Sequence, residues 1–348
     1  DMRRLADGWA KTARTGSPAP KIVRDASTAA LLARAYPGRI AKARGNGGQF
    51  ILATGRGADS APTDALSHWR SPGTWFVWNF KVKDAGNYNK EASMFAGFLK
   101  DQRHVNGVDI AYRIGGSGPG LLLLHGHPQT HVIWHKVAEQ LAEHFTVIAA
   151  DLRGYGDSSK PPAVDGHSHY CKREMAKDNV ELMKSLGFEQ FSVLAHDRGA
   201  RVAHRLALDH PATVHRMVLL DIAPTLAMYT QTNEAFARAY WHWFFLIRPA
   251  PLPETLIEAD PEAYLRSVMG SRSAGLKPFT AEAFGEYLRC LKLPGAARGI
   301  CEDYRASASI DLEHDRADIA AVHHLNLPLL VLWGAEDTVR RCFKPLKE

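Results

Sequence analysis

Ser192-Val-Leu-Ala195, followed by His196-Asp197-Arg198-Gly199, is the stretch that decides the fold. The first four residues are typical of the end of a buried strand, and the helical pattern Ala200 to Asp209 begins directly after the second four. Small residues stand two places before and two places after Asp197, as the sharp strand-to-helix turn of a nucleophile elbow requires. Taken alone, Asp197 is equally well explained as a helix N-cap, so the rest of the sequence has to decide.

Similar short apolar runs recur after residue 94 and end at polar residues. They are Leu121–Leu124 before His125, Thr146–Ala150 before Asp151, Met217–Leu220 before Asp221 and Leu329–Trp333 before Gly334. Helical patterns such as Ala176 to Leu186 separate them, and this alternation predicts an α/β fold with a mostly parallel sheet flanked by helices. Ligands bind beyond the carboxyl ends of such strands, so these polar residues are candidates for the site.

The positive charge is confined to the first quarter of the chain. The formal net charge is +6, but residues 1–93 hold 15 Lys/Arg against 7 Asp/Glu, and the remaining 255 residues hold 28 against 30. We therefore expect no nucleic-acid partner for the chain as a whole. No apolar run reaches the ~18 residues of a membrane span, so no membrane partner is expected. Four cysteines without C-x-x-C spacing and the lack of a secretory pattern favour a cytoplasmic location.

Two segments of different character precede residue 94. Residues 1–68, with Phe50-Ile-Leu-Ala-Thr-Gly-Arg-Gly-Ala58, resemble an internal fragment of HrpB-type ATP-dependent helicases. The sequence contains no G-x-x-x-x-G-K-[ST] phosphate-binding loop, so we expect no helicase motor. In residues 69–93 aromatic residues and lysines mix, which would suit stacking on single-stranded nucleic acid, but we interpret this segment as a junction. Met94 reads as a fresh start.

A carboxylate at the nucleophile position limits the chemistry. Asp197 cannot form the transferable acyl group that serine forms, but it can attack a saturated carbon and give an alkyl ester. His125-Gly-His-Pro128 follows the four leucines, where the backbone N–H of His127 and that of Arg198 would form an oxyanion hole. His-Gly-x-Pro and, about 70 residues later, His-Asp-Arg-Gly together predict the α/β-hydrolase fold.

From Met94 to about Leu346 the sequence closely resembles the fluoroacetate (haloacetate) dehalogenases of the α/β-hydrolase superfamily. The phrases that carry the resemblance include His125-Gly-His-Pro-Gln-Thr-His131, Asp151-Leu-Arg-Gly-Tyr-Gly156, His196-Asp-Arg-Gly-Ala-Arg201 and Cys301-Glu-Asp-Tyr-Arg305. The resemblance implies hydrolysis of fluoroacetate to glycolate and halide, with Asp197 as nucleophile and an alkyl-ester intermediate. It implies a small halogenated carboxylate as partner and neither cofactor nor metal; a homodimer is left open.

The resemblance also assigns the binding residues. Arg198 and Arg201 would clamp the substrate carboxylate, and their i to i+3 spacing at the start of a helix supports this. His242, Trp243 and Tyr304 would form a cradle of N–H and O–H donors for the halide, although such aromatic residues are otherwise typical of a core. These three fall in residues 225–310, which we interpret as a helical cap inserted between the core segments 94–224 and 311–348.

The assignment of the remaining catalytic residues, the acid and the base, is incomplete. Asp221, 24 residues after the nucleophile, matches the family's acid that orients a catalytic histidine, and Asp337 is the alternative. The family's water-activating histidine should follow Leu346, but none of the 17 histidines follows Trp333. We therefore expect an ester that stalls for lack of a base. The last strand and helix of the fold are expected to be missing, with an open sheet edge at Leu329–Trp333.

Other interpretations of the same residues exist. An epoxide hydrolase shares the Asp nucleophile and the His-Gly-x-Pro loop, but a neutral epoxide would leave Arg201 without a carboxylate. A non-catalytic hydrolase remnant, or a nucleic-acid binder driven by the basic first segment, belongs to a different class. A zinc site at His125, His127, His131 and His135 would lack a Cys or Glu ligand. Halide release and salt-dependent DNA binding discriminate between the enzyme and the non-catalytic classes.

Overall fold

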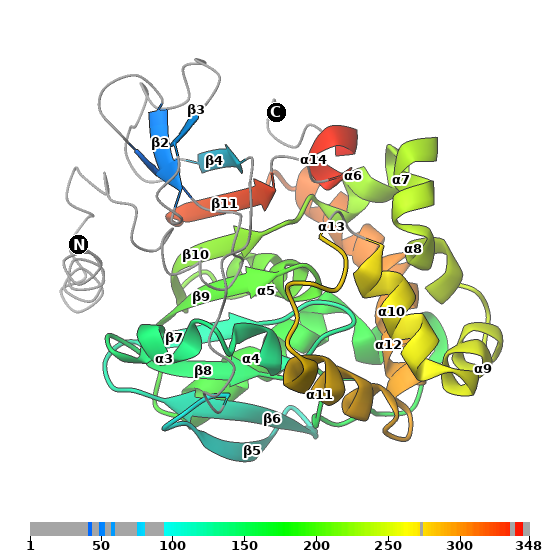
Figure 1. Cartoon of the computed structure of the whole chain (residues 1–348), viewed down its shortest axis with the longest axis horizontal. Helices are drawn as coiled ribbons and strands as arrows, with labels where there is room; N and C mark the ends of the chain where they lie inside the picture. The colour runs from blue at the N-terminus through cyan, green and yellow to red at the C-terminus, as the bar shows by residue number, and fades with distance from the viewer. Residues whose placement is uncertain are drawn as a thin grey trace.

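The central feature of the molecule is an eight-stranded sheet in the order β4-β11-β10-β9-β7-β8-β6-β5 (Figure 1). The computed structural model describes residues 41–43, 49–52, 57–59, 75–80, 94–271, 274–334 and 338–343. The strands are β4 (Trp75–Phe80), β5 (Leu99–Val105), β6 (Val108–Gly115), β7 (Gly120–Leu124), β8 (Thr146–Ala150), β9 (Phe191–His196), β10 (Val214–Leu220) and β11 (Leu329–Gly334). β5 pairs with β6 and β6 with β8 in antiparallel fashion, and the other neighbours are parallel.

The five apolar runs that the sequence places in strands are confirmed as β7 to β11. β7 is buried along its whole length, and its register with β9 pairs Leu124 with Ala195 just before the elbow. Such strands are covered on both faces, which explains why their sequence is continuously apolar instead of alternating. The α/β-hydrolase architecture predicted from these runs is therefore present.

Helices from the core segments cover the two faces of the sheet. They are α3 (Ala138–Ala142), α4 (Lys172–Ser185), α5 (Arg198–Asp209), α13 (Ile310–Ala320) and α14 (Thr338–Phe343), with 3-10 turns η1 (His131–Trp134) and η2 (Asp165–Tyr170). The predicted helices at 176–186 and 200–209 correspond to α4 and α5. α5 packs against β7, β9 and β10, so its first turn lies beside the carboxyl ends of these strands.

A set of helices between β10 and α13 covers one end of the sheet. They are α6 (Thr225–Thr230), α7 (Glu234–Ala239), α8 (Trp241–Leu246), α9 (Leu252–Ala259), α10 (Pro261–Gly270), α11 (Ala281–Leu291) and α12 (Ala296–Ser307). In Figure 1 they gather on the side toward which β11 and its parallel neighbours point. Large side chains from α8 and α12, among them Trp243 and Tyr304, are almost completely buried there. The helices therefore face the edge where the candidate residues end their strands.

The edge of the sheet at β11 differs from the expectation of an open edge. β4 pairs with β11 in parallel, with Trp75 opposite Leu329 and Phe80 opposite Gly334. The segment interpreted as a junction thus contributes a strand, because backbone N–H and C=O groups at a sheet edge favour pairing with any extended segment. A separate sheet in the order β1-β2-β3 comprises β1 (Ala41–Ala43), β2 (Gln49–Leu52) and β3 (Gly57–Asp59).

None of the helices in the described ranges combines the length and the apolar character that crossing a lipid bilayer requires.

Candidate active site

The nucleophile elbow places Asp197 between β9 and α5 in a strained backbone conformation. Its φ of 48° and ψ of −113° lie outside the regions that side-chain-bearing residues ordinarily adopt. Gly199 permits this turn: a Cβ there would lie 2.4 Å from the carbonyl oxygen of His125, which accepts a 2.8 Å bond from the Gly199 N–H. The strain holds the Asp197 side chain at the end of the strand, where the cap helices cover it.

The loop after β7 lies directly against the Asp197 carboxylate. The backbone N–H of His127 donates to Asp197 Oδ1 at 2.9 Å. Gly126 makes this approach possible, because a Cβ at that position would lie 2.5 Å from the Cβ of Asp197. The structure therefore places one of the two expected oxyanion donors on the nucleophile itself.

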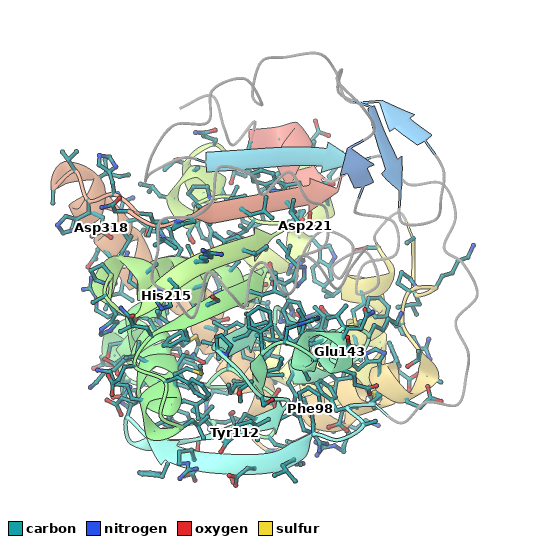
Figure 2. All side chains as sticks on the ribbon, turned by 90° about the vertical axis from the view of Figure 1, so that its left-hand side faces the viewer. Phe98, Tyr112, Glu143, His215, Asp221 and Asp318 are labelled. Carbon is teal, nitrogen blue, oxygen red and sulfur yellow. The ribbon has the colours of Figure 1, made fainter. Side chains whose placement is uncertain are left out.

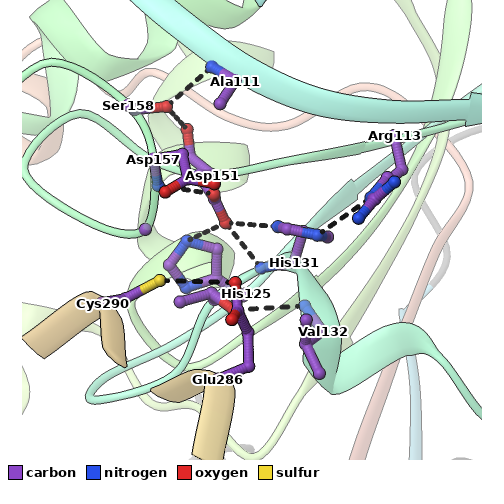
Figure 3. A network of polar contacts seen from close by, with 12 residues as sticks. Ala111, Arg113, His125, His131, Val132, Asp151, Asp157, Ser158, Glu286 and Cys290 are labelled. Atoms are coloured by element: carbon purple, nitrogen blue, oxygen red, sulfur yellow. Dashed lines mark hydrogen bonds and ion pairs between the residues drawn. The ribbon is translucent and has the colours of Figure 1, made fainter. Parts of the chain in front are cut away.

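A buried network centred on Asp151 holds this loop in place (Figure 3). Asp151 Oδ1 accepts bonds from the backbone N–H of His131 at 2.7 Å and from its ring Nδ1 at 2.8 Å. The Leu152 N–H donates to Nε2 of His125, so the Nδ1–H of His125 donates to the Gly126 carbonyl. Burial would raise the pKa of Asp151, but the two histidines more than offset it and hold the pKa below its usual range. His125 and His131 thus serve the loop, which leaves them committed to protein partners and not to a metal.

The Asp197 carboxylate is ionised despite its burial. Burial raises the pKa of Asp197. The neighbouring His196, Arg198 and Arg201 and the His127 N–H lower it by a larger amount, so the pKa lies below its ordinary value. An ionised carboxylate is the form that attacks a carbon atom. The electrostatics of the site therefore suit a nucleophile more than a proton donor.

Arg198 is fully buried and neutralised by a carboxylate from the cap. Its Nε and Nη2 donate to the two carboxylate oxygens of Asp303 on α12 at 2.8 and 2.7 Å, and Nη2 also reaches Ser307 Oγ at 2.6 Å. Asp303 raises the pKa of Arg198 well above its ordinary value, although burial opposes this. Among the described residues, Nη1 of Arg198 has no hydrogen-bond partner, so one edge of the guanidinium remains available.

Arg201 is buried in a different way. Its Nη1 donates to the Ala223 carbonyl at 3.0 Å and to Thr225 Oγ1 at 2.6 Å, and its Nη2 lies 2.9 Å from Met228 Sδ. Burial, followed by the neighbouring Arg198, lowers its pKa to about 10. None of its hydrogen bonds within the described part of the chain goes to a carboxylate, and Nε has no partner. A buried cation with neutral partners favours the binding of an anion.

The three residues assigned to a halide cradle lie together in the cap. The Trp243 and Tyr304 rings are 6.0 Å apart, and the His242 ring is 6.0 Å from Tyr304. Trp243 Nε1 and the Tyr304 hydroxyl are buried without a hydrogen-bond partner in the part of the chain that the structure describes. Their rings lie under the two arginines, with Arg198 4.1 Å from the centre of Tyr304 and Arg201 4.7 Å from that of Trp243. The cradle and the arginine pair therefore form one site.

Asp221 lies at the end of β10, beside the nucleophile's strand. The Asp197 N–H donates to the Leu220 carbonyl at 3.2 Å, and Asp221 Oδ1 accepts a bond from the Gly334 N–H at 3.3 Å. Figure 2 shows Asp221 at the ends of β10 and β11, opposite the end that carries His215. The alternative acid, Asp337, lies outside the described residues. Asp221 thus ends the strand next to that of Asp197.

Two site residues were missed by sequence reasoning. Asp303 binds Arg198, Tyr155 (2.6 Å from its hydroxyl) and the Lys172 ammonium, and is fully buried. The sequence feature that could have identified Asp303 is an acidic residue inside the apolar face of a helix, in the phrase Cys301–Arg305. The second is Tyr264 of α10, whose hydroxyl lies 2.9 Å from Nε2 of His127. No local signal pointed to that pair, since the two residues are 137 positions apart.

Comparison with known proteins assigns the chain to a family. A profile of the alpha/beta hydrolase fold matches residues 119–340. The chain belongs to this family. A protein from Burkholderia sp named fluoroacetate dehalogenase is 45% identical over 252 residues, which cover 72% of this chain and 82% of that protein. The resemblance that the sequence motifs carry is thereby confirmed, and this α/β hydrolase is an enzyme.

Other relatives include epoxide hydrolases. The soluble epoxide hydrolase of Corynebacterium sp. (strain C12) is 36% identical over 240 residues, 67% of this chain and 79% of that protein. A crystal structure of an α/β hydrolase from Nostoc sp PCC 7120 superposes with a TM-score of 0.71 at 52% identity, covering 73% of this chain and 86% of that one. A structure assigned as an epoxide hydrolase from Pseudomonas aeruginosa superposes with a TM-score of 0.69 at 41% sequence identity, covering 74% of this chain and 85% of that one.

Proposed function

We propose that this enzyme hydrolyses the carbon–halogen bond of haloacetates, converting fluoroacetate and water to glycolate and halide with Asp197 as nucleophile. The observation that carries the proposal is the buried guanidinium of Arg201, which has neutral hydrogen-bond partners and lies beside Asp197. A small carboxylate supplies an anion that can hydrogen-bond to Arg201 directly, which none of its described hydrogen-bond partners does. The relative from Burkholderia sp named fluoroacetate dehalogenase supports the same substrate class.

In the first half-reaction, the free carboxylate oxygen of Asp197 attacks the carbon that bears the halogen. A carbon–oxygen bond forms, the carbon–halogen bond breaks, and its electron pair leaves with the halide. Trp243 Nε1 and the Tyr304 hydroxyl are buried donors that lack a partner among the residues the structure describes, so they can stabilise the charge as it develops. Donors of this kind matter most for fluoride, which is the poorest leaving group among the halides.

In the second half-reaction, water attacks the Asp197 carboxyl carbon of the ester. Negative charge then develops on Oδ1, the oxygen that the His127 N–H contacts at 2.9 Å. The ester bond breaks, glycolate leaves, and the Asp197 carboxylate is regenerated. General-base help to water is typically worth about 10²–10⁴-fold. Attack by Asp197 on carbon needs no such base, so we propose that ester formation is the faster half-reaction and that the ester accumulates.

Intact-mass spectrometry after incubation with chloroacetate or bromoacetate tests the proposal. The cysteines are blocked first, because Cys342 is partly exposed and would be alkylated. We expect one carboxymethyl group per chain on the peptide that contains Asp197, and none in the Asp197→Asn variant. A folded sample without this adduct contradicts the proposed nucleophile. Sustained release of many halides per chain contradicts the accumulation of the ester but not the role of Asp197 as nucleophile. Salt-dependent DNA binding without halide release would favour the non-catalytic alternative.

A further inference from the structure

We propose that the same site also opens the ring of 2,3-epoxycarboxylates, of which glycidate is the smallest. The inference rests on the proposed function, because it uses the same nucleophile, Asp197, and the same anion site at Arg201. It adds a second class of substrate, whose leaving group is an alkoxide oxygen instead of a halide.

The anion site selects among epoxides. A neutral epoxide would enter beside Arg201 and leave its guanidinium buried without an anionic partner, which is costly. Glycidate removes this objection, because its carboxylate is attached to the ring carbon C2 just as the carboxylate of a haloacetate is attached to the halogen-bearing carbon. With the carboxylate on Arg201, C2 faces Asp197 and the ring oxygen takes the place of the halogen. The arginine that argues against general epoxide hydrolysis thus argues for this subclass.

An alkoxide differs from a halide because it needs a proton. Halide ions are weak bases that hydrogen bonds alone can stabilise, whereas an alkoxide is far more basic than a phenolate, whose acid has a pKa of about 10. The Tyr304 hydroxyl can supply that proton. It is fully buried, has no hydrogen-bond partner within the described ranges, and belongs to a ring 5.2 Å from His127 and 6.0 Å from Trp243.

The charges around Tyr304 suit this role. Burial, followed by the nearby Asp197 carboxylate, raises the pKa of Tyr304 well above its ordinary value, so the phenol keeps its proton until the ring opens. As Asp197 becomes an ester it loses its charge, and the obstacle to forming a phenolate diminishes. The Arg198 guanidinium, 4.1 Å from the centre of the Tyr304 ring, then stabilises the phenolate. Proton release from Tyr304 is therefore coupled to attack by Asp197.

The steps balance as follows. Asp197 forms a bond to C2 of glycidate, the C2–O bond of the ring breaks, and its electron pair stays on the oxygen, which takes the Tyr304 proton. Water then attacks the Asp197 carboxyl carbon, and the ester bond breaks. Of the two protons of that water, one returns to the Tyr304 phenolate and the other goes to the C2 oxygen of the departing glycerate, while the oxygen of the water remains in the Asp197 carboxylate. Glycidate and water give glycerate, with no other reactant.

The test compares three reagents on the cysteine-blocked, full 348-residue chain: bromoacetate, glycidate and glycidol, the neutral alcohol with the same ring. Intact mass and peptide mapping record the ester on Asp197. We expect an adduct from bromoacetate, an adduct of the whole glycidate molecule, and none from glycidol. An Asp197→Asn variant should give none of them.

Two tyrosine variants separate proton donation from packing. Tyr304→Phe should slow ester formation from glycidate about 10²-fold or more, the usual worth of a general acid. With bromoacetate the same variant should lose no more than about tenfold, the worth of a hydrogen bond. Tyr170→Phe is the matched control, because this buried phenol donates to the Pro161 carbonyl and lies outside the site. It should affect both reagents equally.

Each outcome decides between the two proposals. An Asp197 adduct from bromoacetate but none from glycidate overturns the further inference and leaves the proposed function intact. No adduct from either reagent in a folded sample overturns the proposed function itself. Equal adducts from glycidate and glycidol overturn the requirement for a carboxylate. Equal losses for both reagents in Tyr304→Phe overturn the role of Tyr304 as the acid.

Discussion

Arg198 and Arg201 stand one helical turn apart but differ in how their charge is compensated. Asp303 binds Arg198 in a bidentate ion pair, whereas the partners of Arg201 are a carbonyl, a hydroxyl and a thioether. The family resemblance predicts the role of both arginines, and their spacing after Asp197 supports it. The sequence does not predict the difference, because Asp303 lies 105 residues further along the chain. Local spacing reveals which side chains share a helix face but not which distant group neutralises them.

This difference predicts that Arg201 carries most of the recognition of the carboxylate. Arg201→Leu should abolish ester formation from bromoacetate at accessible concentrations, since losing a buried charged partner costs about 2–5 kcal/mol. The rate of adduct formation on Asp197 and the thermal midpoint of the variant are both measured. Arg238→Leu, on the exposed face of α7, is the matched control. Wild-type rates for Arg201→Leu would contradict the assignment.

Among the elements, α5 carries both residues of the proposed site and structural residues in one short helix. Its first turn carries Arg198 and Arg201, and its next turn carries His204 and Arg205. Burial lowers the pKa of His204 to about 4, and the adjacent Arg205 acts in the same direction. Protonation of His204 is therefore linked to the stability of the helix that positions the nucleophile.

The sign of this linkage sets a pH window. Above pH ~6.5, the ordinary pKa of histidine, His204 is neutral in both the folded and the unfolded chain. Between pH values of about 6.5 and 4 only the unfolded chain binds the proton. As the pH is lowered through this window, the free energy of unfolding should therefore fall by at most about 1.4 kcal/mol per pH unit. Denaturant unfolding at several pH values should show a shallower fall for His204→Asn. The exposed His324→Asn control should follow the wild type, and identical slopes for all three proteins would contradict the linkage.

The strands show where pattern reasoning succeeds and where it stops. β7 to β11 were predicted because each is an apolar run that ends at a polar residue, as burial on both faces of a parallel sheet requires. β4 was not predicted, because Trp75–Phe80 lies outside the segment with dehalogenase resemblance and its partner, β11, is about 250 residues away. Strand pairing depends on which edges are available in the assembled sheet, and a local pattern does not contain that information.

At the scale of the whole molecule, ion pairs connect the cap to the core. Asp303 of α12 binds Arg198 of α5 and Lys172 of α4, and the hydroxyl of Tyr155 donates to the same carboxylate. Burial would raise the pKa of Asp303, but Arg198 and Lys172 hold it well below its usual range. Removing one member of such a cluster leaves the others buried without compensation. The cap is thus positioned over Asp197 by charge as well as by packing.

The segments before residue 94 should differ in their importance, and a pair of deletions tests this. Removing residues 1–68 leaves β4 in place, so we expect ester formation on Asp197 within about twofold of the full chain, far below the 1.4 kcal/mol of a tenfold change. Removing residues 1–93 also removes β4 and leaves the backbone of β11 unpaired along that edge.

The longer deletion should lower the thermal midpoint and promote aggregation, because an unpaired edge is a template for pairing with another chain. Each kcal/mol lost shifts the midpoint by about 2–4 °C in a domain of this size. β11 also donates the Gly334 N–H to Asp221, the residue expected to orient the base, so loosening β11 should disturb Asp221 before it affects attack by Asp197. Thermal unfolding, light scattering and the rate of adduct formation are measured on both deletions. If the two behave alike, β4 does not stabilise the sheet, and the segment from 69 to 93 is the passive junction that its sequence suggests.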